Sequence, residues 1–416
     1  MKTASERLLT FDEARQAIMA TAGGCLLPAE GATLADLAGR VLAEDLTAPG
    51  DVPAADNSAM DGYAVRHAEI AGATTASPVT LPVAGFSDAG HPLESLPPGQ
   101  AAYIATGGLL PAGADTIVKI EDVEVAADQR QVVFRSVPPP GSFVRARGRD
   151  MQEGATVLRK GDLLGPFEIG VVASLGRMGV RVRQRPRVAI LTSGDELVMP
   201  FESPSPWQVR NANTAVLAAS IRESGGEPLD LGIVRDDPDR AAAALELAAD
   251  LADLVVTSGG VSLGRRDPFV TAFQTLQVRP VVHGVAMKPG KPLFFGLLAG
   301  RPVFGLPGNQ ASSAVTFQLF VRPYLARMQG RHQPDLPALV LPLARAIDNP
   351  TRRDHFLRGT IVAGEPAATG VSRAEPLERQ DSHLLSSLAG SSILIRHPGD
   401  RPRLEAGEPV TCLALR

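Results

Sequence analysis

Cysteine is nearly absent from the sequence, which has Cys25 and Cys412 as its only two among 416 residues. They lie near opposite ends of the chain and belong to no CxxC or other metal-type spacing. Such a pattern is typical of ordinary thiols in a reducing compartment rather than of a zinc site or a disulfide framework. We therefore expect a cytoplasmic protein.

Long apolar runs and a strong net charge are also missing. No uninterrupted apolar stretch is long enough to cross a bilayer, and residues 1–7 lack the apolar core of a signal peptide. The formal net charge of −4 argues against a general nucleic-acid-binding surface. We expect neither a membrane nor a nucleic acid as a partner.

The familiar phosphate and nucleophile motifs are absent as well. The chain has no GxxxxGK[ST], and no GxGxxG follows a predicted strand. Metalloprotease, zinc and serine-elbow signatures are missing too. ATP- or NAD-dependent chemistry of the common kinds is therefore disfavoured.

The sequence up to about residue 145 predicts two helices followed by β structure. At 416 residues, two to four domains are expected. A capping box at Thr10–Glu13 predicts a helix through about Ala20, and a second box at 33–36 predicts another helix through about residue 42. Short apolar runs broken by Pro and Gly predict a small β-rich domain over 51–145.

Beyond Pro186 the pattern changes to alternating strands and helices. Strands are expected at 188–191, 229–234 and 254–256, with Asn213 capping one intervening helix and Asp237-Pro238 opening the next. This order predicts a three-layer α/β domain with parallel strands. A helix over 309–328 would close this domain, and short β-like runs beyond residue 334 predict a small β domain.

The third of these strands ends in Thr257-Ser258-Gly259-Gly260. Paired glycines allow a ligand to approach the backbone closely or allow positive φ. Ligands of open α/β sheets bind at such carboxyl ends of strands. A tight turn between strand and helix would produce the same sequence, and this stretch alone does not decide between the two.

Polar groups follow other strands of the same predicted sheet. Each could be a solvated turn or a helix cap, and Asp236 and Asp237 could cap the helix after Pro238. If they converge, carboxylates beside backbone amides and two lysines suit a phosphate-bearing substrate with a hard divalent cation. The stretches are Thr192–Glu196, Arg235–Asp237, Lys288–Pro292 and Gly305–Asn309.

Two further clusters precede this domain. Asp56–Val65 contains an Asp-Gly turn signal, for which a hairpin is the alternative interpretation. Arg145–Asp150 is a basic run closed by an acid, for which a charged edge strand is the alternative.

Taken in order, these motifs resemble the molybdopterin molybdenumtransferase family, the bacterial molybdate-insertion proteins related to the C-terminal domain of gephyrin. The resemblance covers nearly the whole chain. It rests on Asp56–Val65, Arg147–Asp150, Gly194–Leu197, Arg235–Pro238, Ser258–Ser262, Lys288–Pro292, Gly305–Asn309 and Gln380–His383.

The resemblance implies a multidomain α/β and β fold. A three-layer α/β molybdopterin-binding domain (186–329) would be joined by an elongated mixed domain (1–50 with 147–185) and two small β-rich domains (51–146 and 335–416). It also implies an elongated homodimer, whose active site lies between the α/β domain of one subunit and the β-rich domain of the other. Other proteins of molybdenum cofactor biosynthesis would be partners.

The implied reaction inserts molybdate into adenylylated molybdopterin and releases AMP with the help of Mg²⁺. By motif matching, Asp61, Asp150, Glu196, Asp236 and Asp267 are catalytic, and Glu196 and Asp267 among them would hold the metal. Molybdate would be bound by Lys288, Lys291, Ser312, Arg358 and Ser382. The cofactor would be bound by Ser258, Gly259, Gly260, Ser262, Pro307, Gly308 and Asn309.

Two other functions are compatible with the same fold. One is a gephyrin-like scaffold with weak or no catalysis, and the other is a paralogue that handles tungstate. Retention of all five acids favours the enzyme, because a scaffold does not need them. The chain departs from the family pattern at Gln310, where proline is usual, at Asn211, where aspartate is common, and at Arg265-Arg266, which adds positive charge beside Asp267.

Overall fold

The computed structural model describes residues 7–260, 267–363 and 371–415. The chain divides into two compact units. The first comprises Met1–Glu44, Gly161–Ile169 and Met178–Arg416, and the second comprises Asp45–Lys160 and Gly170–Arg177. The described part of the chain contains no helix long and apolar enough to cross a membrane. The multidomain α/β and β fold is confirmed, whereas the division into four domains stays a prediction.

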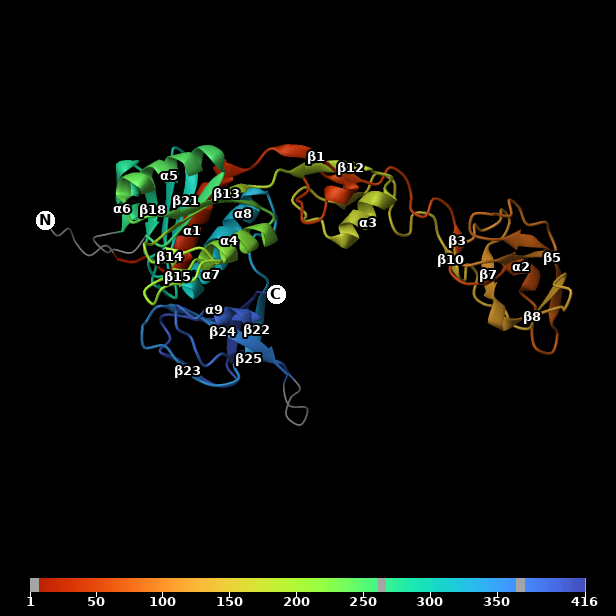
Figure 1. The fold of residues 1–416 in the computed structure, drawn as a ribbon. Helices are drawn as coiled ribbons and strands as arrows, with labels where there is room; N and C mark the ends of the chain where they lie inside the picture. The colour runs from red at the N-terminus through yellow and green to blue at the C-terminus, as the bar shows by residue number, and fades with distance from the viewer. Residues whose placement is uncertain (1–6, 261–266, 364–370, 416) are drawn as a thin grey trace. The chain divides into compact units, whose positions relative to one another are not determined.

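A six-stranded sheet forms the centre of the first unit (Figure 1). Its first four strands are parallel, as predicted, but the fifth runs in the opposite direction and pairs antiparallel with the fourth and the sixth. The reason lies in the turn at Ala299-Gly300, where both residues have positive φ and close a tight hairpin. In spatial order the strands are β16 (Glu227–Val234), β13 (Arg187–Ser193), β17 (Leu254–Ser258), β21 (Arg301–Leu306), β20 (Phe294–Leu298) and β18 (Arg279–His283).

Helices cover both faces of this sheet, so the predicted three-layer domain is confirmed. Successive residues of a strand point to opposite faces. Accordingly, Val188 and Ile190 of β13 pack in one core cluster, whereas Ala189 and Leu191 pack in another. The helices of the first cluster are α1 (Phe11–Ala22), α4 (Ala212–Glu223), α7 (Gln310–Thr316), the π-helical turn η4 (Phe317–Val321) and α8 (Arg322–Met328), and those of the second are α5 (Pro238–Leu251) and α6 (Pro268–Thr275).

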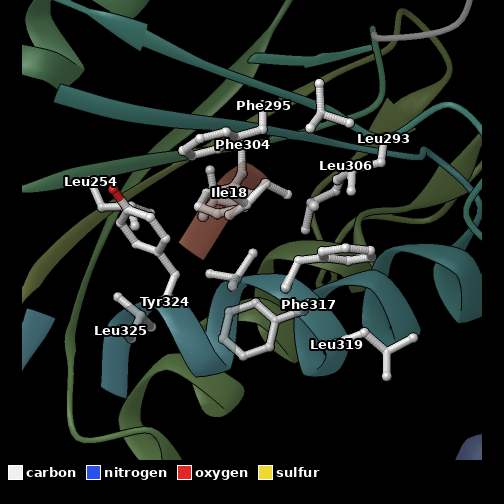
Figure 2. Close-up of a cluster of buried hydrophobic side chains, with 14 of the residues drawn as sticks. Ile18, Leu254, Leu293, Phe295, Phe304, Leu306, Phe317, Leu319, Tyr324 and Leu325 are labelled. Atoms are coloured by element: carbon white, nitrogen blue, oxygen red, sulfur yellow. The ribbon is translucent and has the colours of Figure 1, made fainter. Parts of the chain in front are cut away.

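Figure 2 shows how the first cluster joins distant parts of the chain. Ile18 of α1 lies among Phe295 and Phe304 from the sheet and Phe317 and Tyr324 from the C-terminal helices. All five side chains are buried. The N-terminal helix therefore folds onto the α/β domain, although it precedes that domain by more than a hundred residues.

The helix predictions for the N-terminal region have different outcomes. The capping box of α1 is present, because the Thr10 hydroxyl accepts from the Glu13 amide and the Glu13 carboxylate accepts from the Thr10 amide. The second predicted helix is wrong: only the 3₁₀ turn η2 (Leu34–Asp36) forms, and Gly39 then adopts positive φ. Val41 and Leu42, which suggested the end of this helix, are instead buried from extended chain, where both form β-bridges.

The β-like runs expected at 338–343, 393–395 and 410–415 all form strands of a second sheet within the first unit. Its long strand β24 (Asp354–Val362) was not predicted. The two-residue strand β19 (Met287–Lys288) extends from the α/β domain and pairs parallel with the start of β24, placing Lys288 opposite His355. The other strands are β22 (Ala338–Pro342), β25 (Arg373–Pro376), β26 (Ile393–His397) and β28 (Pro409–Ala414).

The second unit contains the predicted β-rich domain. Its six-stranded sheet surrounds a core that includes Tyr63, Val118 and Phe134. The hairpin interpretation of Asp56–Val65 is wrong, because β3 (Asn57–Ser58) pairs with β10 (Val144–Arg145) while the next strand joins the larger sheet. In spatial order that sheet is β7 (Thr116–Lys119), β4 (Gly62–Val65), β6 (Ala101–Ile104), β5 (Val79–Ser87), β9 (Gln131–Phe134) and β8 (Val123–Val125).

Candidate functional site

A pocket of about 690 Å³ lies where the parallel strands of the first unit end. We call it the carboxylate pocket, because Glu196, Asp236 and Asp267 all line it. The strands β13, β17 and β21 each deliver a loop to its wall, as expected for the carboxyl ends of parallel strands. The predicted cofactor-binding residues in this wall are Ser258, Gly259, Gly260, Pro307, Gly308 and Asn309.

Both glycines after β17 are required by the backbone. Gly259 and Gly260 have φ values of 81° and 68°, a region that side chains rarely tolerate. A Cβ on Gly260 would lie 2.6 Å from both the Phe269 ring and the Ser193 hydroxyl. The two glycines thus let the chain turn tightly over the floor of the carboxylate pocket.

The Ser258 side chain forms hydrogen bonds within the wall of the pocket. Its side chain is buried, and its hydroxyl accepts a hydrogen bond of 2.8 Å from Asn213 Nδ2. Asn213 Nδ2 also donates to the Gly308 carbonyl at 2.7 Å. One amide therefore ties together the loops after β17 and β21.

Asn213 was expected to cap α4, but the structure assigns that role to Asn211. The Asn211 side chain accepts from the Thr214 amide, and α4 begins at Ala212. Asn213 lies in the first turn of the helix and lines the carboxylate pocket. Its position in the pocket could not be read from the capping pattern, because both asparagines are good N-caps.

Asp236 and Asp237 have different roles. Asp237 is the N-cap of α5 and accepts from the amides of Asp239 and Arg240. Asp236 instead lines the carboxylate pocket. Burial raises the pKa of Asp236, and the nearby charges of Asp195 and Glu196 raise it further. Negative charge is thus concentrated at this end of the pocket.

The carboxylate pocket contains both predicted metal ligands. Glu196 and Asp267 line the same pocket, yet no group of three or more His, Cys, Asp or Glu among the described residues is placed to hold an ion. Mg²⁺ commonly takes one or two carboxylates and completes its shell with water and substrate phosphate. Two carboxylates beside a concentration of negative charge fit such an ion, although they do not form a closed protein site.

A second pocket of about 630 Å³ adjoins the first. We call it the lysine pocket, because Lys288 and Lys291 line it together with the predicted residues Ser312 and Ser382. Pro292, Pro307 and Asn309 line both pockets and form their common wall.

Two further features of the lysine pocket were not anticipated. Arg353 and Arg379 contribute two more positive charges, and the acids Glu378 and Asp381 lie in the wall as well. The Asn309 amide donates to the Ser382 hydroxyl at 3.0 Å, which fixes that serine against the common wall.

Arg358 does not line either pocket. Its side chain is fully buried, and its guanidinium donates to the carbonyls of Arg379 and Asp381. Gln380 bonds to both the amide and the carbonyl of Arg358. The structure therefore gives Arg358 the role of holding the segment that carries Ser382. The predicted direct contact between Arg358 and the oxyanion stays a prediction.

The surroundings of His355 in β24 lower the pKa of this histidine. Burial, and then the positive charges of Lys288, His397, Arg358 and Arg353, lower the pKa of His355 to about 3. His355 is therefore neutral at physiological pH and leaves the positive charge of the lysine pocket unchanged.

Asp61 and Asp150, the remaining predicted acids, belong to the second unit. Asp61 Oδ1 accepts from the Thr106 amide at 2.6 Å and from its hydroxyl at 2.8 Å, and both bonds lower the pKa of Asp61. Thr106 was missed because a lone threonine in a glycine-containing turn has no distinctive pattern.

The basic run before Asp150 is held by acids of the same unit. The Arg147 side chain bonds to Asp51, and its amide donates to Asp56. The Asp150 amide donates to the Val52 carbonyl, so the two motifs lie side by side. The edge-strand interpretation applies only to Val144–Arg145. Ser262, Arg265 and Arg266 lie outside the described residues.

Comparison with known proteins covers nearly the whole chain. Residues 9–176 match the family described as the MoeA N-terminal region (domain I and II). Residues 189–327 match a probable molybdopterin binding domain, and residues 340–415 match the MoeA C-terminal region (domain IV).

Similar proteins of known name span almost the same length. The chain is 34% identical to the molybdopterin molybdenumtransferase of Haemophilus influenzae over 410 residues, covering 97% of this chain and 98% of the relative. It is 36% identical to molybdopterin molybdenumtransferase 2 of Mycobacterium tuberculosis over 375 residues, or 89% and 91% of the two chains. The solved molybdopterin biosynthesis MoeA protein of Pyrococcus horikoshii OT3 superposes with a TM-score of 0.83 at 27% identity, covering 98% of this chain and 100% of that one.

Proposed function

Because the chain belongs to the molybdopterin molybdenumtransferase family, we propose that it inserts molybdate into adenylylated molybdopterin and releases AMP. The single observation that carries this proposal is the pair of adjoining pockets, one lined by carboxylates and glycine backbone, the other by lysines. They share the wall made by Pro292, Pro307 and Asn309.

The lysine pocket suits an oxyanion such as molybdate. Molybdate carries two negative charges, and charge-assisted donors hold such anions best. Lys288 and Lys291 supply the charge, and the hydroxyls of Ser312 and Ser382 supply neutral donors. The acids Glu378 and Asp381 in the same wall limit the net positive charge, which would allow the anion to leave.

The carboxylate pocket suits the phosphate link of the substrate. The turn at Gly259-Gly260 lets phosphate oxygens approach the backbone closely. Glu196 and Asp267 would hold Mg²⁺, which would offset the phosphate charge when bound. Asp236, with its raised pKa, is placed to exchange a proton with water or with the departing phosphate.

The common wall relates the two substrates in space. Asn309 lies between the pockets and bonds to Ser382 of the lysine pocket. Molybdate held behind Asn309 would meet the dithiolene of a molybdopterin whose phosphate link occupies the carboxylate pocket. Positioning of this kind replaces a collision in solution with a reaction between held partners.

We also propose that the protein acts as a homodimer, with Asp61 and Asp150 of one subunit completing the site of the other. The two bonds from Thr106 fix the orientation of the exposed Asp61 carboxylate, as an acid that contacts a substrate requires.

A direct assay tests the proposed reaction. Purified protein is incubated with adenylylated molybdopterin and Mg²⁺, with and without molybdate, and AMP is measured. We expect molybdate-dependent release of AMP that falls at least about 100-fold in Asp267→Asn, because the loss of one of two metal-binding carboxylates weakens the stabilisation of phosphate charge. Absence of AMP release from the unaltered protein would rule out the proposal.

A further inference from the structure

An exposed aromatic face beside Asp61 is not explained by the two pockets. Tyr63, Tyr103 and Phe86 lie on three adjacent strands of the second unit and face the same side. Their ring centroids are spaced by 5.8 Å at each step. Tyr63 is buried, Tyr103 is half-buried and Phe86 is 54% exposed, so the row rises from the core to the surface.

Like Phe167, Phe201 and Trp207, Phe86 is exposed, and it continues a row of rings that begins in the core. Tyr103 extends the hydrophobic core of the β-rich domain, and Phe86 packs on Tyr103 with its ring tilted by 53°. Phenylalanine side chains are usually buried. Phe86 instead offers more than half of its surface to solvent on a rigid sheet.

Two carboxylates flank these rings. Asp61 immediately precedes β4, which carries Tyr63, and Asp88 immediately follows β5, which carries Phe86; both acids are exposed. Burial raises the pKa of Tyr103, and the negative charges of Asp61 and Asp88 raise it further. Among the described residues, Thr106 is the donor to the Asp61 carboxylate, and both of its hydrogen bonds go to Asp61 Oδ1. Asp61 Oδ2 and the Asp88 carboxylate thus provide hydrogen-bond acceptors beside a flat apolar surface.

We propose that this face, formed by Phe86, Tyr103, Asp61 and Asp88, binds the pterin ring system of the substrate. Aromatic rings stack on flat heterocycles. The pyrimidine edge of a pterin presents a ring N–H next to an amino group, and neighbouring donors of this kind match carboxylate acceptors. The adenine of the AMP moiety offers a single amino group, so these acceptors favour the pterin end.

The inference rests on the proposed function for the identity of the substrate, but it can be tested without catalysis. The probe is 6-hydroxymethylpterin, whose fluorescence is followed as the full-length protein is added. We expect quenching by the unaltered protein and about tenfold weaker binding by Phe86→Ala, since loss of a stacking partner commonly has this effect. Phe86→Trp should retain binding.

Matched variants separate the site from general effects. Phe167→Ala removes an 85% exposed phenylalanine from helix α3 (Pro166–Ser174) and should leave pterin binding unchanged. Asp88→Asn should weaken pterin binding because it removes the carboxylate charge near Tyr103. AMP is titrated in parallel, and its affinity should be the same in all variants.

Two results would overturn the assignment. If Phe86→Ala binds pterin as tightly as the unaltered protein, the aromatic face is not the pterin site. If it loses AMP binding instead, the face belongs to adenine.

The AMP-release assay distinguishes this inference from the proposed function. Phe86→Ala should raise KM for adenylylated molybdopterin about tenfold with little change in kcat. An unaltered KM with normal AMP release would refute the pterin site and leave the proposed function intact. Absence of release from the unaltered protein would refute the function whatever the pterin titration shows.

Discussion

At the scale of single residues, the floor of the carboxylate pocket depends on backbone shape. Gly260 combines positive φ with close neighbours, whereas Gly232 has positive φ and no heavy atom within 4 Å of an added Cβ. The two positions therefore separate the cost of the dihedral angle from the cost of overlap.

We expect Gly260→Ala to destabilise the protein more than Gly232→Ala. The dihedral angle costs about 1–2 kcal/mol at either position. Overlap with Phe269 and Ser193 adds roughly 1–3 kcal/mol at Gly260. Urea unfolding of both variants measures the difference, and equal losses would show that the loop relaxes around the methyl group.

His355 gives a second prediction at this scale. Its pKa of about 3 in the fold lies below the value of about 6.5 in an unfolded chain. Between these values the unfolded state binds more protons, so stability is complete above pH 6.5 and falls as pH decreases toward 3. We expect His355 to lower the free energy of unfolding by about 2 kcal/mol as the pH falls from 6.5 to 5.

Urea unfolding at pH 5 and pH 7 tests the prediction. His355→Gln should reduce the loss of stability between the two pH values, because its amide does not titrate. His283→Gln, a substitution at an exposed histidine of the same unit, is the matched control. If both variants keep the full loss, the acid sensitivity has another origin.

At the scale of elements, helix α4 carries two asparagines with separate roles. Asn211 caps the helix and also bonds to Thr192, while Asn213 joins Ser258 to Gly308. Loss of a cap typically costs about 1 kcal/mol. We expect Asn211→Ala, at a residue that also lines the carboxylate pocket, to lower the free energy of unfolding by about that amount.

Asn213→Ala should affect substrate binding more than stability. The loops after β17 and β21 would no longer be tied together, so KM for adenylylated molybdopterin should rise several-fold while stability changes less than in Asn211→Ala. Steady-state kinetics and urea unfolding of the two variants measure both quantities. A purely structural role for Asn213 would appear as a stability loss without a change in KM.

Sequence alone located elements where a single physical signal dominates. The apolar run at 254–256 predicted a buried strand, which is confirmed, and the glycines that follow it do adopt positive φ at the sheet edge. Residues 33–42 misled because helical spacing of apolar side chains also occurs in extended chain that contacts several neighbours. Strand β24 was missed because charged residues such as Arg358 are buried in it and interrupt the apolar pattern.

The candidate site follows the same division. Convergence of Glu196, Asp236 and Asp267 could be predicted because parallel strands end at one sheet edge. The common wall of the two pockets could not, because Ser382 comes from a tail with no periodic link to Asn309. Ring contacts such as that between Phe86 and Tyr103 depend on strand register, which no local pattern reveals.

At the scale of the whole molecule, the proposed intersubunit site makes a complementation prediction. Asp61 and Asp267 belong to different compact units of the chain. If each active site takes Asp61 from one subunit and Asp267 from the other, a mixed dimer of Asp61→Asn and Asp267→Asn chains contains one intact site and one doubly altered site.

We expect mixed dimers to recover up to about half of the activity of the unaltered dimer, whereas each variant alone is nearly inactive. Subunits are mixed under conditions that allow exchange, mixed dimers are isolated by two affinity tags, and AMP release is measured. A mixed dimer as inactive as its parents would show that the two acids do not belong to one intersubunit site.

The short strand β19 has a consequence for how the protein can be divided. It covers the start of β24, while β25 covers the far end of the same side. A fragment beginning at residue 335 would lack β19 and would present the backbone donors and acceptors near His355 to solvent. Open strand edges recruit other strands and promote aggregation. The C-terminal sheet is therefore expected to self-associate when produced alone, and its solubility depends on two residues that belong to its neighbour.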